Sequence, residues 1–206
     1  MFIDDLNNVA FIHIPKTAGS SIHICYKDYK GLVGPSRADP LPNIHHMGVK
    51  EFRKIHPEGY RLFAFIRNPW DRLLSGFTEF QNTALRNGTP LSNLIQSSYM
   101  GPEGFFRFCK DLPKNKEVVL ADVHFKPQIT FLDEEADNYG VYFLGRYENL
   151  QEDWNEFAKS IGYPERLVCR HRQTNHAPYQ EMYTSHTKDL VYQFYKQDIK
   201  TFGYKF

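Results

Sequence analysis

Residues 13–21, His-Ile-Pro-Lys-Thr-Ala-Gly-Ser-Ser, combine a cation with several small hydrogen-bond donors. They follow the apolar run 9–12, Val-Ala-Phe-Ile, which is typical of a buried strand. The two serines could cap a helix that starts near Ile22, and a loop at a helix N-terminus favours an anion. The side chains that strengthen this preference are Lys16, Thr17, Ser20 and Ser21. We therefore predict that this loop holds a phosphate or sulfate group.

The loop differs from a Walker A loop. That motif needs Gly-x-x-x-x-Gly-Lys-Ser/Thr, whereas Gly19 follows Lys16 here. Lysine and small residues also occur in ordinary turns, so a plain strand-turn-helix connection is the alternative interpretation of this loop taken alone.

A second basic loop begins at Arg67, directly after the apolar run 61–66. Asn68 and Pro69 then favour the start of a helix, on which Ser75 lies two turns further along. An arginine at a strand end can bind a phosphate through two parallel hydrogen bonds, or it can form an ordinary salt bridge. Because one chain carries two such loops, a ligand with two separated acidic groups is the simpler interpretation.

The elements that must position these loops alternate between strands and helices. Strands are predicted at 9–12, 61–66 and 142–145, and helices from the first loop to about 29 and at 46–55, 70–85, 103–109, 149–161 and 187–202. Residues 87–102 are polar and turn-rich, as expected of a mobile flap, and 169–178 are irregular. This alternation predicts an α/β fold, with a mostly parallel sheet flanked by helices on both faces, in a single domain over 1–206. Both loops would lie at the carboxyl ends of strands, where such sheets bind ligands.

Composition narrows the class of protein. The chain has 206 residues, of which 41% are hydrophobic and 24% charged. Its net charge of +1 argues against a broad nucleic-acid-binding surface but permits a local basic cleft. Its three cysteines form neither a metal pattern nor a disulfide framework, and no carboxylate cluster with metal-ligand spacing stands beside the loops. We see no signal peptide or membrane span, so we expect a cytoplasmic or otherwise soluble protein. A longer, anchored parent chain is compatible with this, and the oligomeric state is not predicted.

Together the two loops resemble those of the sulfotransferases that use 3′-phosphoadenosine-5′-phosphosulfate (PAPS). In particular, they resemble the branch that contains carbohydrate O-sulfotransferases such as the heparan sulfate 2-O-sulfotransferases. In this family a 5′-phosphosulfate loop follows the first strand, and a 3′-phosphate element contains Arg, Asn/Asp-Pro and a Ser eight residues after the Arg. Residues 13–21 and 67–75 match in type, spacing and order. Further similar segments are 124–128, 145–150 and 198–206. The resemblance implies a P-loop-like sulfotransferase fold.

The resemblance also implies residue roles. Lys16 would contact the phosphosulfate bridge and stabilise the leaving phosphate. Arg67 and Ser75 would bind the 3′-phosphate, and the polar loop 170–175 is a candidate for contacts with the adenine. The remaining cofactor-binding residues would be Thr17, Ala18, Gly19, Ser20 and Ser21.

The family places a histidine base between the two loops, where this chain has His45 and His46. His46 opens the apolar pattern of 46–55 and is the expected base, with His45 as a neighbour that could orient it. Histidine titrates near neutrality and can therefore take a proton from a sugar hydroxyl. Two surface histidines without a role are the alternative. His124 could bind the acceptor or hold a turn.

The implied reaction transfers a sulfuryl group in line from PAPS to an acceptor hydroxyl and releases adenosine 3′,5′-bisphosphate, without a metal ion. A glycan is the expected acceptor, with tyrosine, lipid and small-molecule hydroxyls as alternatives. One competing function is a P-loop-like nucleotide kinase, which needs a Walker A loop and an aspartate that holds magnesium. The Walker A loop is absent, and Asp122 or Asp133 is only a weak stand-in for that aspartate. The other competing function is a non-catalytic nucleotide-binding module.

Overall fold

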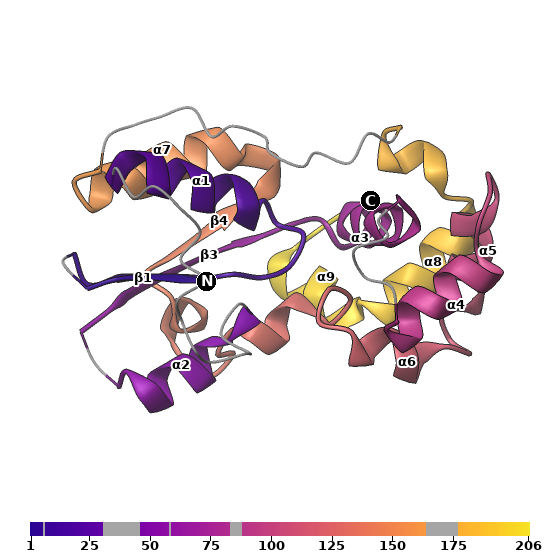
Figure 1. The fold of residues 1–206 in the computed structure, drawn as a ribbon, viewed down its shortest axis with the longest axis horizontal. Coiled ribbons are helices and arrows are strands. Elements are labelled where there is room, and N and C mark those ends of the chain that lie inside the picture. The colour runs from indigo at the N-terminus through magenta and orange to yellow at the C-terminus, as the bar shows by residue number, and fades with distance from the viewer. Residues whose placement is uncertain (6, 31–45, 58, 83–87, 164–176) are drawn as a thin grey trace. The chain divides into compact units, whose positions relative to one another are not determined.

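The computed structural model describes residues 1–206 except 6, 31–45, 58, 83–87 and 164–176 (Figure 1). The chain divides into two compact units. The first comprises residues 1–67 and 128–173, and the second comprises 68–127 and 174–206. Lys16, His46 and Arg67 therefore belong to the first unit, whereas Ser75 belongs to the second.

A four-stranded sheet forms the centre of the first unit. Its strands are β1 (Phe2–Asp4), β2 (Val9–Ile12), β3 (Arg61–Ile66) and β4 (Phe143–Arg146), in the order β1-β2-β3-β4. The three strands β2, β3 and β4 run parallel, and β1 pairs antiparallel with β2. The predicted mostly parallel sheet is thus confirmed. The structure adds β1, a strand too short for its sequence pattern to be recognised.

Helices cover both faces of this sheet (Figure 1). One face carries α1 (Gly19–Lys30) and α7 (Leu150–Ser160), and the other carries α2 (Val49–Ile55). Side chains alternate along a strand, so Phe11 and Phe63 point to the side of α1 and α7, where Phe63 stacks on Phe157 with ring centroids 4.0 Å apart. Burial on both faces explains the uninterrupted apolar runs of β2 and β3 and confirms the α/β prediction. Three 3₁₀ turns complete the described part of this unit: η3 (Gln128–Phe131), η4 (Asp137–Gly140) and η5 (Tyr147–Asn149).

The second unit is helical in its described residues. Its apolar core lies between α3 and the neighbouring helices and includes Phe77, Phe80, Phe108 and Val191. Its elements are α3 (Pro69–Asn82), α4 (Pro90–Ser98), α5 (Gly104–Asp111), α6 (Lys116–Ala121), η6 (Tyr179–Met182), α8 (Ser185–Phe194) and α9 (Lys196–Phe202). The helices predicted at 70–85 and 103–109 correspond to α3 and α5.

Three predictions about local structure are wrong. The segment 87–102, expected to be a flap, contains α4, because the Thr89 hydroxyl accepts a hydrogen bond from the Ser92 N–H and Pro90 takes the first helical position. The helix predicted at 187–202 is two helices, α8 and α9, separated at Tyr195. The serine pair does not cap α1, because that helix already begins at Gly19.

Candidate functional site

The loop that joins β2 to α1 has an unusual backbone. Lys16 and Ala18 are both in the left-handed region, with φ of 70° and 71°. Such a conformation costs a non-glycine residue about 1–3 kcal/mol and is concentrated at functional sites. The Thr17 hydroxyl donates to the Ile14 carbonyl, 2.9 Å away, and so braces the loop from within. The loop is therefore held in a costly shape directly before a helix N-terminus.

Gly19 is required by the imidazole of His13. A Cβ atom at Gly19 would lie only 1.8 Å from His13 Nε2, so no larger residue fits without displacing this ring. Gly19 is also the first residue of α1, whose first N–H groups lack acceptors within the helix. The close contact brings His13, to which the sequence assigned no role, against the start of the helix.

The predicted loop residues differ in their exposure. Thr17 and Ser21 are buried, whereas Lys16, Ala18 and Ser20 are partly exposed. Because its hydroxyl hydrogen goes to Ile14, Thr17 supports the shape of the loop. The partly exposed cation and the N-terminal end of α1 give the loop the chemistry of an anion site.

His46 is anchored to this loop. Its Nδ1 lies 3.0 Å from the carbonyl oxygen of His13, and the two imidazole centroids are 4.7 Å apart. A carbonyl oxygen can only accept, so Nδ1 carries the hydrogen and the lone pair of the neutral ring is on Nε2. In this tautomer Nε2 can accept a proton, which is what a general base must do.

The chain after His46 is held by close packing. The Gly48 N–H donates to Glu51 Oε2, 3.1 Å away, at the start of α2. A Cβ at Gly48 would lie 3.2 Å from the backbone of Phe131, so η3 packs directly against this turn. His46 precedes α2 by three residues and does not open it as predicted, and His45 lies outside the described residues.

Arg67 follows the last residue of β3 and is buried. Its Nη1 donates to the Lys16 carbonyl, 3.1 Å away, and its guanidinium lies over the Tyr147 ring at 3.9 Å from the centroid. Its backbone N–H and C=O both bond to the side-chain amide of Gln128. Arg67 is thus attached to the first anion loop, as expected if the two loops serve one ligand.

Ser75 and Asn68 lie in the second unit. Ser75 is buried on α3. Asn68 caps this helix, because its Oδ1 accepts from the Trp70 N–H at 3.1 Å, and its Nδ2 donates to the Lys205 carbonyl at 2.8 Å. The Asn-Pro pair therefore starts α3 and ties it to the end of the chain.

Two other sequence candidates have local partners. His124 Nδ1 lies 2.8 Å from Asp122 Oδ1, which also accepts from the His124 N–H, so these residues form a compact turn. Asp133 is 3.2 Å from the Lys50 ammonium. Neither Asp122 nor Asp133 follows a strand, which is where the kinase alternative needs its aspartate. The candidate adenine loop, 170–175, lies outside the described residues.

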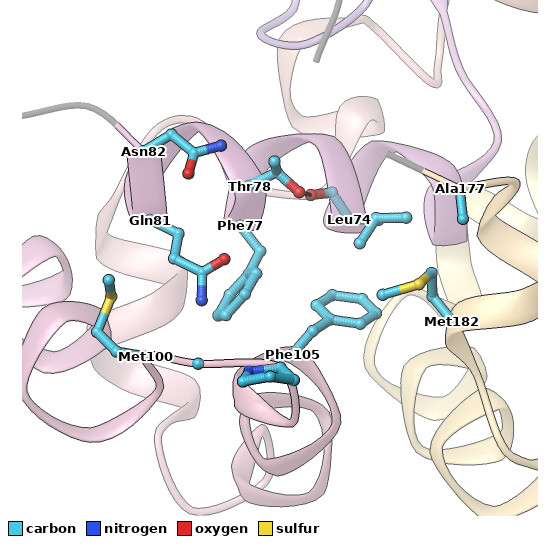
Figure 2. Close-up of a pocket in the computed structure, with 11 residues that line it drawn as sticks. Leu74, Phe77, Thr78, Gln81, Asn82, Met100, Phe105, Ala177 and Met182 are labelled. Atoms are coloured by element: carbon cyan, nitrogen blue, oxygen red, sulfur yellow. Dashed lines mark hydrogen bonds between the residues drawn. The ribbon is translucent and has the colours of Figure 1, made fainter. Parts of the chain in front are cut away.

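The second unit also contains a pocket of about 450 Å³ beside α3 (Figure 2). Its walls include Phe77, Phe105 and Met182, with the uncharged polar side chains of Thr78 and Gln81. Among the described residues no charged side chain lines it, so it lacks the cations that an anionic nucleotide requires. It contains none of the predicted site residues.

The part of the chain that the structure describes contains neither a metal-binding cluster nor a membrane-spanning helix. In 1–206, outside the undescribed segments, no three His, Cys, Asp or Glu side chains gather as a metal centre would need. Across the same residues, the helices are too short or too polar to cross a membrane.

Comparisons with known proteins converge on one family. The profile described as "Sulfotransferase family" matches residues 1–205. The chain is 23% identical over 242 residues to carbohydrate sulfotransferase 9 of Homo sapiens, an alignment that covers 99% of this chain and 53% of the relative. It is 24% identical over 203 residues to carbohydrate sulfotransferase 14 of Danio rerio, an alignment that covers 86% of this chain and 52% of the relative. An uncharacterized protein of Archaeoglobus fulgidus is 26% identical over 113 residues, with 55% and 77% covered. The chain thus spans about half the length of both carbohydrate sulfotransferases.

Proposed function

Because the chain belongs to the sulfotransferase family, we propose that it transfers a sulfuryl group from PAPS to a hydroxyl of a carbohydrate. One observation carries the proposal: both His46 and Arg67 donate hydrogen bonds to carbonyl groups of the same anion loop. The two distances are 3.0 Å to His13 and 3.1 Å to Lys16. A candidate base and a candidate phosphate ligand thus meet at one loop.

The chemistry of this loop fits the anionic donor. The Lys16 ammonium, the Arg67 guanidinium and the start of α1 all favour negative charge. When bound, PAPS supplies the sulfuryl group. Lys16 and the first N–H groups of α1 stabilise the negative charge that grows on the departing phosphate. The loop that surrounds this phosphate is formed by Thr17, Ala18, Gly19, Ser20 and Ser21.

His46 acts as the general base in this proposal. With Nδ1 donating to the His13 carbonyl, Nε2 accepts the proton of the acceptor hydroxyl, and the imidazolium that forms keeps its bond to His13. The ring therefore needs no rotation between the two protonation states. Such a base contributes about 10²–10⁴-fold to the rate.

Recognition of the 3′-phosphate is assigned to Arg67 and Ser75. The guanidinium offers several donors in a planar fork, of which Nη1 already serves the Lys16 carbonyl. The assignment of Ser75 rests on its spacing of eight residues from Arg67. Replacement of Ser75 by alanine should weaken binding of adenosine 3′,5′-bisphosphate more than that of adenosine 5′-monophosphate.

A carbohydrate acceptor is supported by the names of two relatives, both carbohydrate sulfotransferases. The test is a transfer assay with ³⁵S-labelled PAPS against glycans, tyrosine peptides, lipids and small hydroxyl compounds. We expect label in a glycan, and a loss of about 10²–10⁴-fold in the His46→Ala variant, with binding of adenosine 3′,5′-bisphosphate retained. His186→Ala is the matched control, because this histidine is exposed on α8.

Other outcomes would overturn parts of the proposal. Label in a non-glycan would refute the acceptor class alone. Equal rates for wild type and His46→Ala would refute the base. Binding of the nucleotide without transfer to any acceptor would favour the non-catalytic module, and a requirement for ATP with magnesium would favour the kinase.

A further inference from the structure

We propose that Gln128 is a positioning residue that sets Arg67 for recognition of the 3′-phosphate. The inference rests on the proposed function, because it assigns a task to a residue outside the reacting groups. It predicts that selectivity for a nucleotide with a 3′-phosphate depends on a side chain that needs no contact with that nucleotide.

The Gln128 side chain forms two hydrogen bonds with the backbone of one residue. Its Oε1 accepts from the Arg67 N–H at 2.8 Å, and its Nε2 donates to the Arg67 C=O at 2.8 Å. This pattern imitates the pairing that a neighbouring strand would give at the residue where β3 ends. Both partners are buried, so each bond replaces contact with water that these backbone groups have lost.

An amide is the functional group that fits this arrangement. Gln128 must present one acceptor and one donor at the same time, which methionine cannot do. The side chain is 0% exposed, so its atoms are committed to the interior. The two bonds therefore fix the position and orientation of the Arg67 backbone.

The position of the backbone decides where the guanidinium lies. That group is further restrained by the Lys16 carbonyl at 3.1 Å and by the Tyr147 ring at 3.9 Å from its centroid. Binding of a phosphate by an arginine fork depends on direction as well as distance. Loss of the Gln128 bonds would thus weaken contact with a 3′-phosphate. The 5′-phosphate loop would keep its internal hydrogen bond from Thr17 to Ile14, so its affinity for a 5′-phosphate should change less.

The test compares two ligands on two proteins. Calorimetric titration of wild type and Gln128→Met with adenosine 3′,5′-bisphosphate and adenosine 5′-monophosphate gives two affinity ratios. We expect about a 10-fold or greater loss for the bisphosphate in the variant, and less than about a 3-fold loss for the monophosphate. Thr130→Ala, at an exposed position of the same 3₁₀ turn, should keep both affinities.

A double-mutant cycle shows whether Gln128 acts through Arg67. In an Arg67→Ala background, the Gln128→Met change should no longer alter the affinity for the bisphosphate. If Gln128→Met does not fold, Gln128→Asn keeps the amide, lacks its reach and allows the same comparison. Equal losses for the two ligands, or no loss, would overturn the inference. A wild type that binds both ligands equally would instead refute the proposed function.

Discussion

At the scale of single residues, the left-handed backbone of the first anion loop does not lie at its glycine. The left-handed backbone falls on Lys16 and Ala18, whereas the loop's glycine serves the close approach of a ring. From the sequence, Gly19 could be identified as a small residue in an anion loop, and Lys16, His46 and Arg67 as its chemical groups. The anchoring partners of these groups, the carbonyls of His13 and Lys16, leave no trace in the sequence because backbone groups are the same at every position.

Replacement of Ala18 by glycine should stabilise the protein. The left-handed conformation costs alanine about 1–2 kcal/mol, whereas glycine adopts it freely and loses about 0.5–1 kcal/mol through the unfolded chain. We therefore expect the free energy of unfolding in urea to rise by up to about 1 kcal/mol. The control is Ala136→Gly, at an exposed position with φ of −95°, which should not stabilise. The explanation fails if both substitutions have the same effect.

Replacement of Gly19 by alanine should have the opposite effect. The new Cβ would lie 1.8 Å from His13 Nε2, and the displacement should lower the free energy of unfolding by about 1–3 kcal/mol. It should also weaken binding of adenosine 3′,5′-bisphosphate. In a His13→Ala background the clash is gone, so the same change should cost little. An equal cost in both backgrounds would show that the His13 ring is not the obstacle.

At the scale of elements, apolar patterning was sufficient for the buried strands and for most of the long helices. The predicted bounds of 9–12 and 61–66 agree with β2 and β3 because these strands are buried on both faces. The break between α8 and α9 could not be predicted in the same way. It lies at Tyr195, whose hydroxyl donates to the Phe125 carbonyl 2.8 Å away, a contact between residues far apart in the sequence. The role of Gln128 could not be predicted for the same reason, because its partner Arg67 is far from it in the sequence.

The helix α4 can be tested through its cap. Thr89→Ala removes the hydroxyl that accepts from the Ser92 N–H at 3.1 Å, and should destabilise the protein by about 1 kcal/mol. Limited proteolysis should cut residues 90–98 faster in this variant than in wild type. Ser98→Ala, at the exposed end of the helix, should leave the cleavage rate unchanged. Equal cleavage rates for Thr89→Ala and wild type would contradict the role of this cap.

At the scale of the whole molecule, the sulfotransferase match extends over both units, from residue 1 to 205. The candidate base and the first anion loop belong to the unit with the sheet, and Ser75 to the helical unit. We propose that the two together form the single sulfotransferase domain expected from the sequence. The family assignment rests on the profile match over residues 1–205. The identities of 23% and 24% to the two carbohydrate sulfotransferases are low, so the proposed residue roles rest on the geometry of the loop.

Stability should decline at alkaline pH. Burial raises the pKa of the Cys109 thiol and of the Tyr195 phenol, so the unfolded chain releases these protons at lower pH than the folded protein. Above the ordinary values of about 8.5 and 10, the unfolded state binds fewer protons, and each group lowers stability by up to about 1.4 kcal/mol per pH unit. The free energy of unfolding in urea, measured at intervals of about half a pH unit from about pH 8 to about pH 11, should fall with this slope.

Tyr195→Phe separates the contribution of one phenol. We expect a loss of about 1 kcal/mol at neutral pH, from the hydrogen bond to Phe125, and a shallower alkaline slope. Tyr142→Phe is the control, because this tyrosine is 50% exposed. A slope that is the same in wild type and Tyr195→Phe would contradict the assignment.

The central claim is that the loop at Lys16 and the arginine at 67 serve one nucleotide with two separated acidic groups. The most direct measurement is calorimetric titration with adenosine 3′,5′-bisphosphate in the presence of EDTA, beside adenosine 5′-monophosphate and ATP with magnesium. We predict that the bisphosphate binds at least about 10-fold more tightly than the monophosphate without any metal ion. Lys16→Ala and Arg67→Ala should both weaken binding of the bisphosphate. Equal affinity for the bisphosphate and the monophosphate, or a preference for ATP with magnesium, would contradict the claim.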